Sequence, residues 1–125
     1  MKLTSAAILF TFVASSVFAA CPGKPPNKTW NTQAGDQAVT NAWLEKTLTN
    51  KKVKFETGGV EHYRKDGTYR FTTGGQRYDA TGYQFYSNGV RCIAYSTPRF
   101  DRYVVNNGQL VLINWQGSRY DAKIR

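Results

Sequence analysis

Histidine and cysteine are scarce in this chain of 125 residues. One histidine and two cysteines cannot supply the four nitrogen and sulfur ligands that a structural zinc site usually needs. The length accommodates one domain, which excludes a nucleotide-binding α/β fold with a separate substrate domain. Charged residues make up 20% and aromatic residues 14% of the chain, a balance that disfavours wholesale disorder. We therefore expect one ordered domain without a metal ion or another cofactor.

Long hydrophobic runs are missing too, apart from the mostly apolar residues 6–14. This run follows Lys2 and is too short to span a bilayer, but it has the length of the apolar centre of a secretory signal peptide. Val17 and Ala19 occupy the −3 and −1 positions of a cleavage site after Ala19. We expect residues 1–19 to be a signal peptide and the protein to be exported, periplasmic or extracellular, without a transmembrane segment.

Negative charge is the other shortage. The chain has 8 Asp and Glu against 17 Lys and Arg, a formal net charge of +9. Only Lys2 lies in the expected signal peptide, so 16 positive and 8 negative charges, a net +8, remain after its removal. The excess of positive charge therefore belongs to the folded domain.

The two cysteines permit one intramolecular disulfide, between Cys21 and Cys92, which export would allow. It would close a loop of roughly 70 residues and stabilise the fold by up to about 4 kcal/mol. Strand alternation puts Cys92 on the same face as Val90, which predicts a disulfide inside the barrel or at one end. The alternatives are free thiols and a lipoprotein acylated at Cys21, although Phe18 stands where that signal usually has leucine.

The segment after the signal peptide, residues 20–35, contains three of the four prolines and is predicted to be an extended leader. Asn27 begins a glycosylation sequon, which matters only in a eukaryotic source. Residues 36–48 are the one predicted helix, with Asp36 as its cap and Val39 and Trp43 on one face.

Turn signals divide the rest of the chain into short segments of β-strand composition. The predicted strands are residues 51–57, 60–65, 68–73, 77–80 and 82–86 across a weak break, 90–95, 100–105, 109–114 and 119–124. This rhythm predicts a mainly β fold, an antiparallel meander of seven or eight short strands forming a small barrel, with one short N-terminal helix. We expect residues 36–125 to form this single β-barrel domain.

Four short motifs suggest a relationship to known domains: YRKDGTY at 63–69, GYQF at 82–85, NGVRC at 88–92 and GSRY at 117–120. With them, residues 43–125 resemble small exported bacterial domains of calycin-like (lipocalin-related) build. In those domains a strand often reads Gly-Trp-x-x before a turn and a cysteine. Here Tyr83 replaces the tryptophan, and the second cysteine one strand later is missing. The resemblance implies a fold and a compartment but no activity.

His62 is the candidate catalytic residue. A histidine general base near Glu56 and Arg64 would suit phosphodiester cleavage, as in small secreted ribonucleases. Arg64 shares the face of His62, whereas the adjacent Glu61 points to the opposite face. Glu56 would join them if the hairpin at 58–59 brought its strand alongside. A small secreted phosphodiesterase-like hydrolase is therefore the alternative hypothesis for function.

Positive charge interleaved with aromatic residues is the stronger pattern. The candidate binding residues are Lys51, Lys52, Lys54, Arg64, Arg70, Arg77, Tyr63 and Tyr78. Such a surface attracts polyanions, and aromatic rings beside arginine can also stack on bases. We expect a non-enzymatic binding protein for an anionic glycan, another anionic envelope component or a partner protein, with nucleic acid as a weaker candidate. A barrel holding one small apolar ligand is a further alternative.

Overall fold

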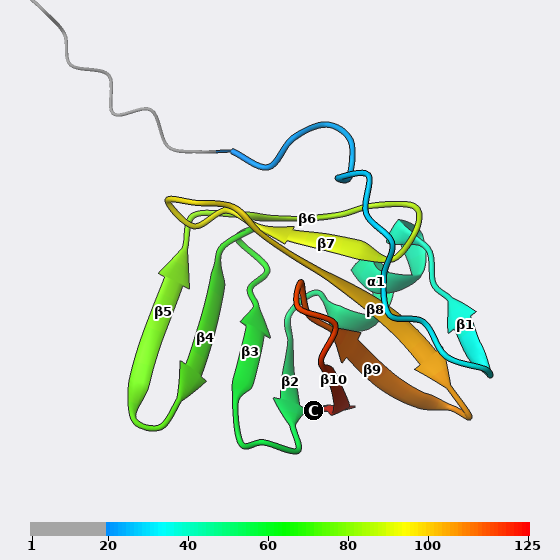
Figure 1. Cartoon of the computed structure of the whole chain (residues 1–125). Helices are drawn as coiled ribbons and strands as arrows, with labels where there is room; N and C mark the ends of the chain where they lie inside the picture. The colour runs from blue at the N-terminus through cyan, green and yellow to red at the C-terminus, as the bar shows by residue number, and fades with distance from the viewer. Residues whose placement is uncertain (1–19) are drawn as a thin grey trace, which may run out of the picture.

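The structure, a computed structural model, describes residues 20–125 as a nearly closed antiparallel β-barrel with one short helix (Figure 1). The expected signal peptide lies outside the described residues. The elements are β1 (Asp36–Ala38), α1 (Asn41–Leu48), β2 (Lys51–Phe55), β3 (Val60–Tyr63), β4 (Tyr69–Thr73), β5 (Gln76–Ala80), β6 (Tyr83–Phe85), β7 (Val90–Ile93), β8 (Arg99–Asn106), β9 (Gln109–Ile113) and β10 (Arg119–Ile124).

The strands follow the order β5-β4-β3-β2-β10-β9-β8-β7-β6, and β1 pairs with β8 beside this path. The mainly β, meandering barrel is therefore confirmed, and it is compatible with a calycin-like architecture. There are ten strands instead of seven or eight, because β5 and β6 are separate strands and β1 forms within the segment expected to be helical. β5 and β6 each have one partner, so the barrel is open between them. No helix among residues 20–125 has the length and hydrophobicity needed to cross a membrane.

The predicted helix was too long and was assigned the wrong face. Thr40, not Asp36, is its N-cap, and its side-chain oxygen accepts a hydrogen bond from the Trp43 backbone N at 3.1 Å. Leu44 and Leu48 face the core and are fully buried, whereas Trp43 is 38% exposed. The first residues of the expected helix instead form β1, which pairs with β8. The helix therefore begins at the next residue that can cap it.

Asp36 has a different role, since its carboxylate binds the Arg119 guanidinium of β10 at 2.7 and 2.8 Å. The Arg119 hydrogen bond holds the pKa of this carboxyl well below its usual range, against the opposing effect of burial. Asp36 also accepts a hydrogen bond from the Gln33 backbone N at 2.8 Å. The end of the leader is thus attached to the barrel wall through one buried carboxylate.

The barrel has an inner and an outer apolar layer. The inner core includes Leu44 and Leu48 of the helix and the inward residues of the strands. The outer layer lies where residues 20–35 cross β6 to β9, and it contains Trp30, Val90, Cys92 and Val104 (Figure 1). The predicted Cys21–Cys92 disulfide is present and fastens this segment. Of the two places expected for it, inside the barrel or at one end, the first was wrong, because β7 is buried on both faces and apolarity alone did not reveal which face is inner.

Candidate functional site

A band of positive charge covers the outer face of β2, β3, β4, β5 and β10. We call it the basic wall and define it by six cations: Lys52, Lys54, Arg70, Arg77, Lys123 and Arg125. Its side chains point outward because they alternate with buried residues such as Val53 and Phe55. The barrel closure makes this surface, because it places β10, the last strand, beside β2.

Two pairs of cations face each other across β2 and β10. Lys54 is directly opposite Lys123 in the register. Lys52 is opposite Arg125, since their backbone groups exchange hydrogen bonds of 2.8 and 3.3 Å. Like charges at such positions destabilise a sheet. Within residues 20–125, none of these four side chains forms an ion pair.

The other side of the wall is partly neutralised. Arg70 and Arg77 both pair with Asp79 of β5, at 2.7 and 3.2 Å, in an exposed position. Such exposed pairs contribute little to stability. Glu56 and Asp121 bound the wall at one end without forming an ion pair with its lysines among the described residues. Uncompensated charge is therefore concentrated at the junction of β2 and β10.

The basic wall contains four of the eight predicted binding residues, Lys52, Lys54, Arg70 and Arg77, and Arg64 follows β3 close enough to His62 for its charge to lower the pKa of that residue. Lys51 is exposed but lies opposite Tyr63, on the inward register of β2 at the barrel end. Tyr63 itself is fully buried and cannot touch a ligand on the outer wall. Tyr78 is 46% exposed but stacks on Phe71, on the inward register of the edge strand. The sequence could have predicted that Tyr63 is buried, because alternation along β3 places Tyr63 on the same face as Glu61, opposite to His62.

Lys123 and Arg125 are wall residues that the sequence analysis missed. Their charges were visible, but their strand is separated from β2 by more than sixty positions in the chain. The signal that could have found them is barrel closure, which pairs the first and last strands of a meander.

His62 lies on the wall between Lys52 of β2 and Arg70 of β4, opposite each in the register. Its pKa is lowered from the usual value of 6.5, first by partial burial and then by the charges of Lys52, Arg64 and Arg70. The imidazole therefore lies at the centre of the wall, where its pKa depends on the surrounding positive charge.

We expect this histidine to report anion binding directly. In the free protein its imidazole should titrate below the usual pKa of 6.5, because its cationic neighbours oppose a further positive charge. An anionic polymer on the wall should raise that pKa by screening the same neighbours. NMR titration of the tag-free protein with dextran sulfate measures it, since the chain has one histidine. An unchanged pKa with bound polymer would place the polymer elsewhere.

The proposed catalytic group is not assembled. Lys52, not Glu56, is the residue opposite His62, and Glu56 lies about 13 Å further along at roughly 3.3 Å per residue. The Glu56 carboxylate accepts a hydrogen bond of 3.4 Å from the Asp121 backbone instead. Arg64 stays near His62 but disfavours its protonation. Glu61 points inward, as adjacent strand positions require.

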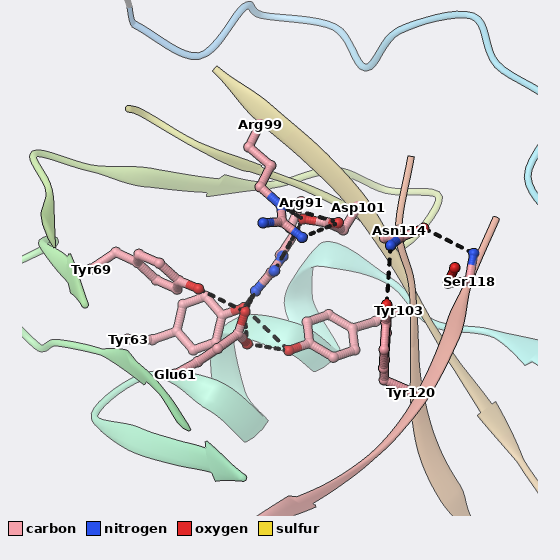
Figure 2. A network of polar contacts seen from close by, with 10 residues as sticks. All are labelled: Glu61, Tyr63, Tyr69, Arg91, Arg99, Asp101, Tyr103, Asn114, Ser118 and Tyr120. Carbon is pink, nitrogen blue, oxygen red and sulfur yellow. Dashed lines mark hydrogen bonds and ion pairs between the residues drawn. The ribbon is translucent and has the colours of Figure 1, made fainter. Parts of the chain in front are cut away.

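The barrel interior holds a polar network that sequence reasoning missed (Figure 2). Arg91 of β7, 2% exposed, bridges two fully buried carboxylates, Glu61 of β3 and Asp101 of β8. Its Nη2 lies 3.0 Å from Asp101 Oδ2, and its Nη1 donates to Glu61. Arg99, at the start of β8, adds a second contact to Asp101 at 3.1 Å. Two cations and two anions thus balance inside the barrel.

Three tyrosine hydroxyls complete the coordination of Glu61. Tyr69 donates to Oε1 at 2.7 Å and Tyr63 donates to Oε2 at 2.9 Å, while Tyr103 also donates to Oε2. Burial raises the pKa of all three hydroxyls, so they remain protonated donors at neutral pH. With these donors and Arg91, the Glu61 carboxylate has four partners and is poorly suited to act as a base.

A cavity of about 300 Å³ adjoins this network. Aromatic residues of several strands line it, together with the half-exposed Arg99. The interior is therefore not completely filled, and one small molecule could enter. Within the part of the chain that the structure describes, no group of three or more His, Cys, Asp or Glu residues is placed to hold a metal ion.

Sequence and structure comparisons give no relative from which a role could be transferred, so the geometry above has to carry the functional argument. No protein-family model matches the chain, and neither a curated protein nor a solved structure shows significant similarity to it.

Proposed function

We propose that this chain is an exported, non-enzymatic binding protein whose basic wall engages an anionic envelope component or a partner protein with an anionic surface. The facing cations of β2 and β10 carry the proposal. Lys52 faces Arg125 and Lys54 faces Lys123, and a free barrel gains nothing from such repulsion. An anion bound between them would convert that repulsion into attraction and displace counterions.

The placement of the aromatic rings favours an anionic polymer that is recognised by charge alone over nucleic acid, whose bases would need stacking surfaces. Stacking on bases needs exposed rings among the cations. Tyr63 and Tyr69 are buried inside the barrel, and Tyr78 is directed to the inward side of β5. The wall therefore offers charge without stacking surfaces. The Cys21–Cys92 disulfide supports an oxidising compartment, where envelope polymers are found.

The test compares wall lysines with lysines elsewhere. Lys54→Gln combined with Lys123→Gln should weaken binding to dextran sulfate and reduce the slope of log affinity against log salt by about two, since each lost contact releases roughly one counterion fewer. Titration calorimetry from roughly 50 to 200 mM NaCl gives the slope. Removing the facing pair should leave the thermal stability unchanged or slightly raised.

The matched control is Lys24→Gln with Lys46→Gln, which removes two exposed charges from the leader and the helix. If both double variants lose the same affinity, net charge alone drives binding and the wall is not the site. Uncharged dextran should not bind to any of these proteins. Failure of wild type to bind dextran sulfate even at low salt would overturn the proposal.

A further inference from the structure

The strand β5 forms a free edge of the barrel. Among residues 20–125 only β4 pairs with it, and four of its five residues are exposed (Figure 1). Natural proteins often protect such an edge with proline, a β-bulge or an inward-pointing charge, because its unpaired backbone groups can bind another strand. Residues 76–80 carry none of these: their register with β4 is continuous, and their inward positions hold Gln76, Tyr78 and Ala80. The edge is therefore open to a further strand.

The hairpin between β4 and β5 fixes which backbone groups of β5 point to the open side. Thr73 pairs with Gln76 across a two-residue turn whose glycines both have positive φ angles. The residues that flank such a turn exchange backbone hydrogen bonds, so Gln76 bonds to β4. Because this direction alternates along a strand, Arg77 and Asp79 direct their backbone N–H and C=O groups to the open side. Within β5, a second strand can therefore bond at these two positions.

The side chains of β5 complement those of a second copy in one register. In an antiparallel pair with its two-fold axis at Tyr78, Arg77 of each copy is opposite Asp79 of the other. An axis at Arg77 would oppose two arginines, and an axis at Asp79 would oppose two aspartates. Opposite charges at such positions stabilise a strand pair, whereas like charges destabilise it. The axis at Tyr78 also aligns the open backbone groups of Arg77 and Asp79 as hydrogen-bonded pairs.

The inward face of the edge supplies an aromatic contact in the same register. Tyr78 is 46% exposed, and its ring stacks on Phe71 of β4 with 6.4 Å between centroids. Its hydroxyl donates to Gln76 Oε1 at 2.5 Å, so the ring is held in place. At the two-fold axis the two copies of Tyr78 form a non-hydrogen-bonded pair, in which side chains approach closely and aromatic rings stabilise a sheet. Pairing would thus cover a ring that the isolated barrel leaves in water.

The charge at this edge is the most nearly balanced part of the basic wall. Arg70 and Arg77 share the carboxylate of Asp79, whereas the uncompensated cations lie at the junction of β2 and β10. Two positively charged copies therefore repel each other less at β5 than at that junction.

We propose that two copies of this chain associate through their β5 edges, antiparallel and in the register that pairs Arg77 with Asp79 of the other copy. Residues opposite each other in a sheet lie on the same face, so the two basic walls become one surface. The association does not rest on the proposed function, because it needs no ligand. The contact spans five residues and belongs with weak, transient interfaces, so we expect a dissociation constant of about 10 to 100 µM.

The test exchanges the two edge charges. Sedimentation velocity of wild type from about 5 to 500 µM should show a monomer becoming a dimer. Arg77→Asp opposes two aspartates and Asp79→Arg opposes two arginines, so each variant alone should associate at least about tenfold more weakly. A mixture of the two variants restores both opposite-charge pairs and should form a heterodimer about as tightly as wild type.

The matched control is Lys24→Asp, which changes the net charge as Arg77→Asp does but at an exposed position of the leader. It should dimerise like wild type. Circular dichroism verifies that each variant is folded. If Asp79→Arg is not, because Arg70 lies opposite it, Arg77→Asp and its control still carry the test. The inference is overturned if wild type stays monomeric at every concentration, if Arg77→Asp and Lys24→Asp associate alike, or if the two folded edge variants fail to associate when mixed.

Discussion

Replacing Arg91 by methionine is expected to lower the free energy of unfolding by about 3 to 5 kcal/mol. Arg91 is the cation shared by Glu61 and Asp101, and all three side chains are almost completely buried. Methionine fills similar space but leaves two carboxylates inside the barrel without that charge. Urea unfolding followed by circular dichroism at neutral pH measures the loss.

The pH dependence of this variant distinguishes lost charge compensation from poor packing. Without Arg91, two carboxylates are buried without their shared cation, and burial favours the neutral, protonated form of such groups, so the folded state binds more protons than the unfolded chain. Its stability should therefore fall with rising pH, and the deficit against wild type should be smaller at acidic pH than at neutral pH. A deficit independent of pH would indicate a packing defect instead.

Arg99→Met is the matched control for Arg91→Met. Arg99 also contacts Asp101, but its side chain is 49% exposed and water can replace the contact. We expect a loss of about 1 kcal/mol or less. Equal losses in the two variants would mean that burial of Arg91 is not what makes it important.

Removing the disulfide with Cys21→Ala and Cys92→Ala should lower stability by about 4 kcal/mol, because the bond closes a loop across 71 positions. The same bond holds residues 20–35 over the outer apolar layer, which includes Val104 and Val111. We therefore expect proteolysis within the leader to accelerate before the barrel unfolds. Denaturation curves and limited proteolysis of the variant provide the two measurements.

Wild-type protein under reducing conditions is the comparison for the disulfide variant. It loses the covalent bond but retains both sulfur atoms. If reduction causes the same loss as the substitutions, the effect comes from the bond. If reduced protein is as stable as oxidised protein, the contacts of Trp30 and the Asp36–Arg119 ion pair hold the leader without help from the disulfide.

The basic wall shows which features of a surface can be predicted from the residue pattern within one strand. Alternation correctly directed Glu61 away from His62, because this conclusion depends on neighbours within one strand. It did not predict that Lys54 meets Lys123, because that contact depends on which strands pair at closure. The same limit hid the free edge of β5, because alternation within a strand does not show which strands have only one partner.

The sequence by itself determined the fold class, the strand rhythm and the turns, and it limited an intramolecular disulfide to one possible pair. Turn residues and period-two alternation are local signals, and Gly67 and Gly89 adopt the positive φ angles that such turns require. Tertiary structure alone decided which face of β7 is inner, and so placed Arg91 between two buried acids and Cys92 beneath the leader. Both faces of that strand are buried, so hydrophobicity does not distinguish them. The choice comes from charge compensation: Asp101 faces Arg91 across the β7–β8 hairpin, whereas Glu61 of β3 meets Arg91 only once the barrel has folded.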